Sequence, residues 1–329
     1  VHRVEEEPAP NSEHPQNVLN KEVTISDLVF MIGPRINAAG RLEKASDSVR
    51  LLIAERKEHA EKLASSINDL NVRRREFDNK ITEEALQMIQ QDERLLQAKS
   101  TVIFNENWHK GVIGIVASRL TDTYYRPTIV LTRSNNLITG SARSIKNFDI
   151  YDAIDNCSDL LEHFGGHKYA AGLSLKPENL SEFSRRFEEY VSNNIDKEEL
   201  IPELNVDLEI NFSDITPKFV RVLKQFSPFG PGNMAPVFLS RNVIDSGSSR
   251  PVGGQEKKHL KLSMTQKHDN NLILPGIAFQ KGADYQRVNS KEPFSICYCI
   301  EKNFWQGKTN LQLNVKDIKF ENDGNVLEK

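Results

Sequence analysis

The sequence has few cysteines and no long apolar run. Its 329 residues include only three cysteines, too few and too unevenly placed for a disulfide framework. Cys297 and Cys299 stand two apart in a strand pattern and are expected to be packed thiols, because no further metal ligands accompany them. No apolar stretch approaches the roughly 20 residues of a membrane span, and residues 5–7 are glutamates where a signal peptide would be basic. We therefore expect no membrane association and a reducing, cytoplasmic location.

The net charge of −3 excludes a protein that is basic as a whole. Nucleic-acid binding would then depend on local clusters of basic residues. One cluster is formed by the arginines at 73–75, where Arg74 is a candidate DNA-backbone contact and a solvated helix face is the alternative. The other contains Lys257, Lys258 and Lys261, which either follow a phosphate backbone or line a solvated strand edge.

The hydrophobic pattern predicts a fold of the α/β plus β class. Residues 1–45 are a polar junction segment, and residues 46–98, which carry an apolar stripe at helical spacing, are expected to form a long connecting helix. A continuous helix over residues 58–91 would span roughly 50 Å at 1.5 Å per residue. Residues 99–197 alternate short strands with helices, as in an α/β layer, and residues 198–329 read as the short strands of a small closed β-barrel.

Local signals predict where several elements end. A short helix through Ile32 is expected to stop at Gly33-Pro34. Residues 206–212 alternate apolar and polar side chains and are expected to form a strand. Residues 164–172 are expected to form a glycine loop before the next strand.

This glycine segment carries the most informative chemistry. Gly165 and Gly166 let the backbone approach a ligand, and His167 supplies a donor or a titratable charge. About twenty-five residues upstream, Ser141 and Arg143 end a predicted strand with groups suited to phosphate. A turn histidine and a surface ion pair are the structural alternatives for His167 and Arg143.

Three segments together resemble the DHHA1 domain of RecJ-type exonucleases, the single-strand-specific 5′→3′ DNA nucleases of the DHH phosphoesterase superfamily. They are residues 109–120, 140–144 and 164–172. Residues 33–41 resemble the segment where those enzymes leave their catalytic domain, and residues 228–238 resemble the entry to their OB-fold. The motifs run in family order over most of the chain. Lys110 replaces a proline usual in the family, which leaves the shape of that loop open.

The resemblance implies roles for individual residues. Ser141 and Arg143 resemble residues that receive the 5′ end of the strand. The expected phosphate- and substrate-binding set is Ser141, Arg143, Gly165, Gly166, His167, Arg35, Asn37 and His109. For Arg35 and Arg41, ion-pairing across a domain junction and a DNA contact are equal alternatives. In the β domain, Phe226, Phe229, Phe304 and above all Trp305 are candidates for base stacking, although most aromatics of small barrels are core.

The motif that names the superfamily is missing. The sequence contains no Asp-His-His, its eight histidines are scattered, and it begins with Val1. We therefore expect the C-terminal portion of a longer enzyme, with no catalytic residue and no bound metal in this chain and two Mn²⁺ or Mg²⁺ ions in the complete protein. The predicted function is to grip single-stranded DNA for a 5′→3′ exonuclease of DNA repair and recombination, with this chain inactive alone. A non-catalytic single-strand-binding or replisome scaffold is the alternative; a small-nucleotide DHH phosphoesterase is a third, disfavoured by the β domain.

Overall fold

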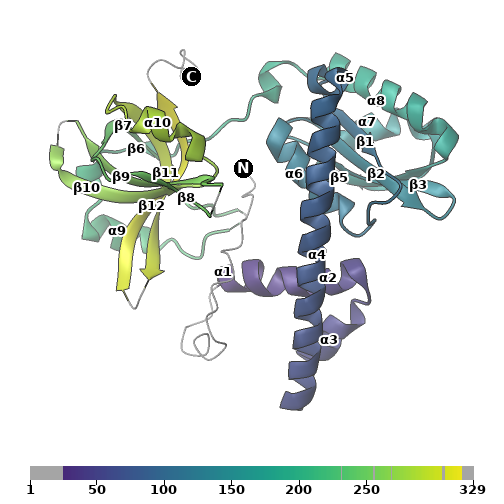
Figure 1. Cartoon of the computed structure of the whole chain (residues 1–329), viewed down its shortest axis with the longest axis horizontal. Helices are drawn as coiled ribbons and strands as arrows, with labels where there is room; N and C mark the ends of the chain where they lie inside the picture. The colour runs from purple at the N-terminus through teal and green to yellow at the C-terminus, as the bar shows by residue number, and fades with distance from the viewer. Residues whose placement is uncertain (1–24, 231, 255, 268, 306–307, 321–329) are drawn as a thin grey trace. The chain divides into compact units, whose positions relative to one another are not determined.

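The computed structural model describes residues 25–320 except 231, 255, 268, 306 and 307 (Figure 1). The chain divides into two compact units, Val1–Glu203 and Leu204–Lys329, which are described separately. None of the helices among the described residues is long and apolar enough to cross a membrane.

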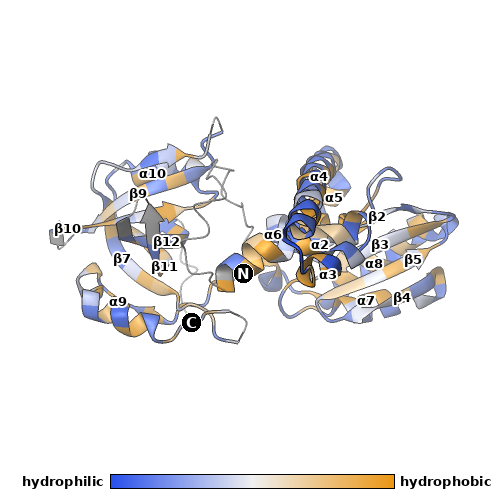
Figure 2. Cartoon of the chain, turned by 90° about the horizontal axis from the view of Figure 1, so that it is seen from below, coloured by the Kyte–Doolittle hydropathy of each residue, from blue (hydrophilic) through white to orange (hydrophobic). Residues whose placement is uncertain are grey.

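The first unit opens with six helical segments. They are α1 (Ile25–Asp27), the π-helix η2 (Leu28–Ile32), α2 (Gly33–Leu42), α3 (Ser46–Leu52), α4 (Lys57–Gln91) and α5 (Glu93–Gln97). The 35 residues of α4 are continuous, which confirms the helix predicted over residues 58–91. Its buried apolar residues, among them Ile67, Ile81 and Ile89, lie on the predicted stripe. Figure 2 shows the rest of α4 to be largely hydrophilic.

Two predicted helix boundaries are wrong. The chain stays helical through Gly33, because Pro34 falls in the first turn of α2, where a missing N–H costs nothing. The helix expected without interruption from Ser46 breaks before α4, since Arg56 is extended. No glycine or proline marks that break, so apolar spacing alone could not reveal it.

The α/β layer of the first unit is a five-stranded sheet in the order β1-β2-β3-β5-β4. The strands are β1 (Thr101–Phe104), β2 (Thr128–Ser134), β3 (Leu137–Arg143), β4 (Leu161–His167) and β5 (Ala170–Leu175); only the β1–β2 pair is parallel. The helices of this layer are α6 (Ile113–Tyr124), α7 (Ile150–Asp155) and α8 (Leu180–Asn194), with 3₁₀ turns at Ser158–Leu160, Pro177–Asn179 and Glu198–Leu200.

The two faces of this sheet are covered differently. On one face Leu131 and Leu173 pack with Phe183 and Phe187 of α8, and this core extends under β5. On the other face Val130 packs with α6 and with the buried stripe of α4. The helix α6 contacts β2 and β3, so the β5–β4 side of this second face is left to small and polar residues.

The second unit is a strongly curved seven-stranded sheet. Its strands are β6 (Leu208–Glu209), β7 (Phe238–Asp245), β8 (Arg250–Val252), β9 (His259–Gln266), β10 (Asp269–Ala278), β11 (Phe294–Trp305) and β12 (Lys308–Phe320). The order is β6-β7-β11-β12-β10-β9-β8, and a further β7–β9 pairing closes five of the strands into a ring. Two helices, α9 (Pro217–Lys224) and α10 (Tyr285–Val288), and 3₁₀ turns at Phe212–Asp214 and Gly282–Asp284 complete this unit.

This ring takes the place of the small closed barrel predicted for residues 198–329, although it is not a clean barrel. Its core includes the fully buried Tyr298, whose hydroxyl lies 2.8 Å from the Ser240 hydroxyl. The strand expected over residues 206–212 is much shorter. Asn211 and Asp214 form a capping box that turns the chain into a 3₁₀ helix after β6.

Candidate functional site

Strand register places the predicted phosphate-binding residues on one face of the sheet. Arg143 of β3 lies opposite Ala170 of β5, which lies opposite His167 of β4. Directly opposed residues of antiparallel strands point to the same face. Arg143 and His167 therefore lie on the same face of the sheet, Arg143 beside α6 and His167 on the edge strand β4, with their strands about 10 Å apart, two strand spacings.

The row beside them has almost no side chains. Ser141 lies opposite Gly172, and Gly172 opposite Gly165. Both glycines are exposed, and a Cβ added at Gly165 would meet no atom within 4 Å. The result is an open, flat strip of backbone between Arg143 and His167, which we call the glycine floor (Ala170, Gly172 and Gly165).

The glycine segment is a strand rather than the expected loop. Gly165, Gly166 and His167 end β4, and only Lys168 and Tyr169 form the turn to β5. The φ of Gly166 is 154°, and a Cβ there would lie 2.4 Å from the Ala170 carbonyl oxygen. Small residues on the facing strand β5 make this close pairing possible. The glycine content of the segment alone did not predict that it pairs as a strand.

Arg143 is held in place by its neighbours. Its Nε donates to Ser118 Oγ at 3.1 Å, and its Nη1 donates to Ser141 Oγ at 3.0 Å and to the Ala142 carbonyl at 2.7 Å. Partial burial, reinforced by the Arg41 cation, lowers the pKa of Arg143, although a guanidinium remains charged at any physiological pH. These bonds fix the side chain, and no carboxylate of the described residues forms an ion pair with it.

A cavity of about 390 Å³ opens beside Arg143. Its lining contains three cations and no acidic residue: Gly40, Arg41, Lys110, Gly111, Ile113, Gly114, Thr139, Gly140, Ser141 and Arg143. The first residues of α6 belong to this lining, and a helix N-terminus favours anions. The cavity therefore has the charge and donors of a phosphate site.

Two glycines create the room for this cavity. A Cβ at Gly114 would lie 3.0 Å from Ser141 Oγ and 3.2 Å from Arg143 Nη2. A Cβ at Gly111 would lie 2.1 Å from the Arg41 carbonyl oxygen, and Arg41 Nη1 in turn donates to the Gly111 carbonyl at 3.1 Å. The two glycines thus let the backbone at the start of α6 lie close to the end of α2 and to the side chains of β3.

The structure adds residues that sequence reasoning did not assign to this site. Lys110, Gly114 and Thr139 line the cavity but were not among the candidates. Arg41, for which a DNA contact and an ion pair were equal alternatives, also lines it. The paired glycines at 111 and 114 were an available signal, because such spacing at a helix start is typical of close packing against an anion site.

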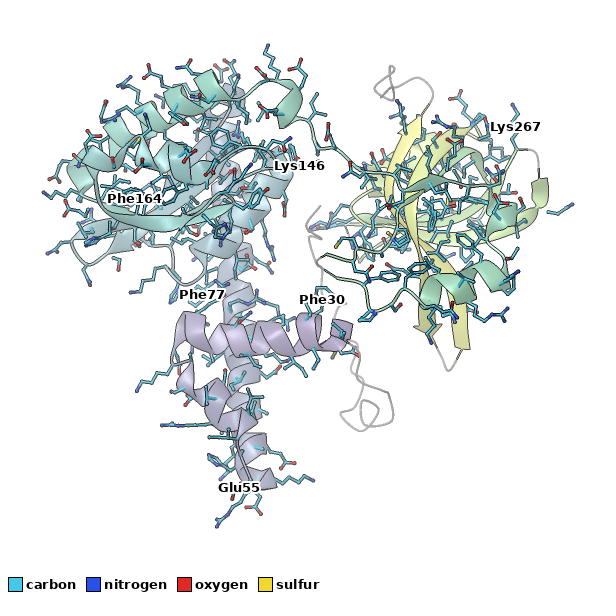
Figure 3. All side chains as sticks on the ribbon, turned by 180° about the vertical axis from the view of Figure 1, so that it is seen from behind. Phe30, Glu55, Phe77, Lys146, Phe164 and Lys267 are labelled. Atoms are coloured by element: carbon cyan, nitrogen blue, oxygen red, sulfur yellow. The ribbon has the colours of Figure 1, made fainter. Side chains whose placement is uncertain are left out.

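Other candidates lie beside the cavity rather than in it. Arg35 Nε donates to Asn68 Oδ1 at 3.2 Å, a contact within the helical region, and Asn37 is exposed. The ring of His109 stacks on the ring of Phe77, with 5.4 Å between the ring centroids; Phe77 is labelled in Figure 3. The Nδ1 of His109 accepts a hydrogen bond from the Gly111 N–H at 3.1 Å. Burial, with Lys110 and Arg73 nearby, lowers the pKa of His109.

His167 is exposed at the far end of the glycine floor. Its Nδ1 accepts the Tyr169 N–H at 3.3 Å. The neutral ring therefore carries its proton on Nε2, which makes that atom a hydrogen-bond donor.

Arg74 is part of a buried ion pair, so the helix is not exposed on every side as expected there. Only 13% of its side chain is exposed, and its Nη1 lies 3.6 Å from Asp78, which is fully buried. Arg119 of α6 approaches the same carboxylate at 2.9 Å. Burial outweighs both cations and raises the pKa of Asp78. Asp78 thus joins α4 to Arg119 of α6, and Arg74, which pairs with it within α4, is left out of the candidate site.

The three lysines of the cluster in the second unit have different surroundings. Lys258 is paired with Glu256, whereas Lys257 is exposed in a left-handed turn with φ 50°. Lys261 lies directly opposite Arg250 on β8, where both are exposed. The side chain of Trp305 lies outside the described residues, as do those of Phe304 and its neighbours.

Among the described residues, no group of three or more His, Cys, Asp or Glu side chains converges in a way that could hold a metal ion. Ser141, Arg143 and His167 at the two ends of the glycine floor are instead hydrogen-bond donors, and Arg143 is a cation. Their chemistry fits a phosphate rather than a divalent cation.

Comparison with known proteins gives a consistent result for both units. Residues 97–193 match the DHHA1 domain, and residues 206–317 match the RecJ OB domain. The single-stranded-DNA-specific exonuclease RecJ of Bacillus subtilis (strain 168) is 36% identical over 290 residues, which is 88% of this chain and 36% of that protein.

Solved structures extend the match. The crystal structure of RecJ from Thermus thermophilus with Mg²⁺ has a TM-score of 0.76 and 26% identity, covering 92% of this chain and 45% of that one. The complex with Mn²⁺ has a TM-score of 0.77 at the same identity and covers 43% of that chain. This chain therefore spans less than half the length of each of these relatives.

Proposed function

Because this chain belongs with the RecJ exonucleases, to which its DHHA1 and OB domains are homologous, we propose that it is the part of such an enzyme that grips single-stranded DNA. The complete protein would hydrolyse phosphodiesters from the 5′ end of the strand. The observation that supports this most is the glycine floor, with Arg143 and Ser141 at one end and His167 at the other.

Each group of the site has a distinct task in this proposal. The Arg143 guanidinium and the Ser141 hydroxyl bind the terminal phosphate, and Arg41 and Lys110 add positive charge around the cavity. The strand then lies over Gly172 and Gly165, where the absence of side chains lets nucleotides approach the backbone. His167 Nε2 donates to a phosphate or base at the far end.

The metal chemistry is proposed for the complete protein. The related RecJ structures were solved with Mg²⁺ and with Mn²⁺. The described residues offer no fitting ligand set, so we assign no metal-dependent step to them. We propose that the two metal ions are bound by residues outside this chain, that this chain alone does not hydrolyse DNA, and that the protein works in the cytoplasm.

The RecJ OB domain match favours a strand-binding protein over a small-nucleotide phosphoesterase, because a dinucleotide has no use for a second binding domain. A non-catalytic scaffold would share the strand-binding residues but would have no reason to distinguish the 5′ end. Recognition of the 5′ end therefore separates the two proposals.

The test is a titration of the whole chain with 5′-phosphorylated and 5′-hydroxyl oligonucleotides of one sequence. A charge-assisted contact to the terminal phosphate is worth about 1.5–3 kcal/mol, so the phosphate should tighten binding roughly ten- to a hundredfold. Arg143→Ala should abolish this difference, whereas the control Arg133→Ala, an exposed arginine at the other end of the sheet, should preserve it. Equal affinity of wild type for both oligonucleotides would contradict the proposal.

A further inference from the structure

The helix α9 carries positive charge, and neither it nor the loop that follows it contains an acidic residue. Residues 215–244 contain four basic residues and no aspartate or glutamate, in a chain whose net charge is −3. Arg241 is neutralised by Glu209 at 3.0 Å. The other three cations lie on α9 and are exposed: Lys218, Arg221 and Lys224.

The three cations follow one flank of α9. The opposite flank, with Phe219, Val220 and Leu223, packs on the barrel core. Spacing of three residues advances each cation by about 4.5 Å along the helix axis. Within the described part of the chain none of the three forms an ion pair, so their charge is available to a ligand.

An aromatic ring is exposed where this helix ends. Phe226 is 62% exposed, although phenylalanine usually gains by burial. Its backbone is held by Asn233, whose Nδ2 donates to the Phe226 carbonyl at 2.9 Å and to the Pro228 carbonyl at 3.0 Å. Gly230 and Asn233 exchange two backbone hydrogen bonds of 2.9 Å. The loop is thus a built structure that presents the ring to solvent.

We propose that Lys218, Arg221, Lys224 and Phe226, which we call the α9 platform, form a second contact for single-stranded nucleic acid. Phe226 stacks on an unpaired base, and the cations contact neighbouring phosphates. A duplex does not offer a free base face, so the platform selects single strands. The ligand class rests on the proposed function, but the residues are independent of the glycine floor.

The test measures binding of the whole chain to an unphosphorylated oligothymidine of about 20 nucleotides, longer than one OB-fold site. Phe226→Ala should weaken binding roughly 5- to 150-fold, the range for loss of one stacked base. Phe226→Trp should restore it and Phe226→Leu should not, because leucine keeps apolar area but has no ring. The control is Leu208→Ala, which removes a similarly exposed apolar side chain between Asp207 and Glu209.

The cations are tested by salt dependence. Replacing Lys218, Arg221 and Lys224 together by alanine should reduce the slope of log affinity against log salt by about 2, at roughly 0.7 per phosphate contact. An unchanged slope would overturn their assignment. Thermal melts check that the variants fold.

The outcomes separate this inference from the proposed function. If Phe226→Ala and Phe226→Leu both bind like wild type while Arg143→Ala loses its phosphate preference, the α9 platform is overturned and the proposed function stands. If Phe226→Ala weakens binding while wild type ignores the 5′ phosphate, the platform is supported and the proposed function fails. Should Phe226→Ala lose affinity for a polyglutamate peptide and keep it for the oligonucleotide, the surface is a protein contact and the inference is wrong.

Discussion

A bulky side chain on the glycine floor should block strand binding without unfolding the protein. Gly165 is exposed, lies in a strand with no left-handed φ, and has no neighbour within 4 Å of an added Cβ. Gly165→Val should therefore be neutral or stabilising by about 0.5–1 kcal/mol, because glycine is unfavourable in a strand and a β-branched residue is not. The same side chain would stand in the path between Arg143 and His167.

The loss of binding follows from the contacts that the valine prevents. If the strand can no longer reach both Arg143 and His167, one hydrogen bond to a charged group is lost, worth about 1.5–3 kcal/mol, or roughly ten- to a hundredfold in affinity. Gly166→Ala is the matched control in the neighbouring position. Its Cβ would lie 2.4 Å from the Ala170 carbonyl oxygen, so this variant should lose stability first.

The assay pairs fluorescence anisotropy on a 5′-phosphorylated oligonucleotide with thermal melting. The expected pattern is a stable Gly165→Val protein that binds weakly and a destabilised Gly166→Ala protein. A folded Gly165→Val chain with wild-type affinity would refute the glycine floor as the strand path.

Three further predictions follow from the same structure. In the complete enzyme, Arg143→Ala should reduce the digestion rate of 5′-phosphorylated oligonucleotides roughly ten- to a hundredfold, and Arg143→Lys should recover only part of it because the ammonium lacks the planar fork; wild-type steady-state rates in folded Arg143→Ala enzyme would contradict the role. Asp78→Ala leaves Arg119 and the partly buried Arg74 without their carboxylate. It should lower the free energy of unfolding, measured by urea denaturation, by about 3–5 kcal/mol. A loss below about 1 kcal/mol would be inconsistent with a buried ion pair. Folding lowers the pKa of His109, so the stability linked to its neutral form is present above the unfolded pKa, near 6.5, and is lost as pH falls through the lower folded pKa. His109→Gln should therefore reduce the fall in melting temperature between about pH 7 and 5. A fall as steep as that of the wild type would argue against this role of His109.

The elements that the sequence predicted well depend on local periodicity. The long helix α4 has an apolar stripe at helical spacing, and the strands β9, β11 and β12 alternate apolar and polar residues. Each pattern is contained in one segment, so no knowledge of the partner segment is needed.

The elements that were missed depend on contacts with another segment of the chain, whether near or far in the sequence. Gly165 and Gly166 read as a loop because glycine is rare in strands, yet facing small residues on β5 allow them to pair. Phe164, labelled in Figure 3, is the one large apolar residue of this stretch and packs into the core. It was the available signal for a strand.

The candidate site could likewise be predicted only where its residues lie in one segment of the sequence. Ser141 and Arg143 were identified because two phosphate-binding groups stand two residues apart in one strand. Arg41 and Lys110 come from other segments and meet them only through the close approach at Gly111 and its neighbour Gly114. Arg74 was a candidate DNA contact because it stands in a run of three arginines, but its guanidinium pairs with the buried Asp78 carboxylate one helical turn away.

The most direct test of the account is a crystal structure of this chain with a short 5′-phosphorylated oligonucleotide. The account predicts the terminal phosphate within hydrogen-bond distance of the Arg143 guanidinium and the Ser141 hydroxyl, with the following nucleotides over Gly172 and Gly165 toward His167. A strand bound elsewhere on the first unit, with the glycine floor empty, would contradict it.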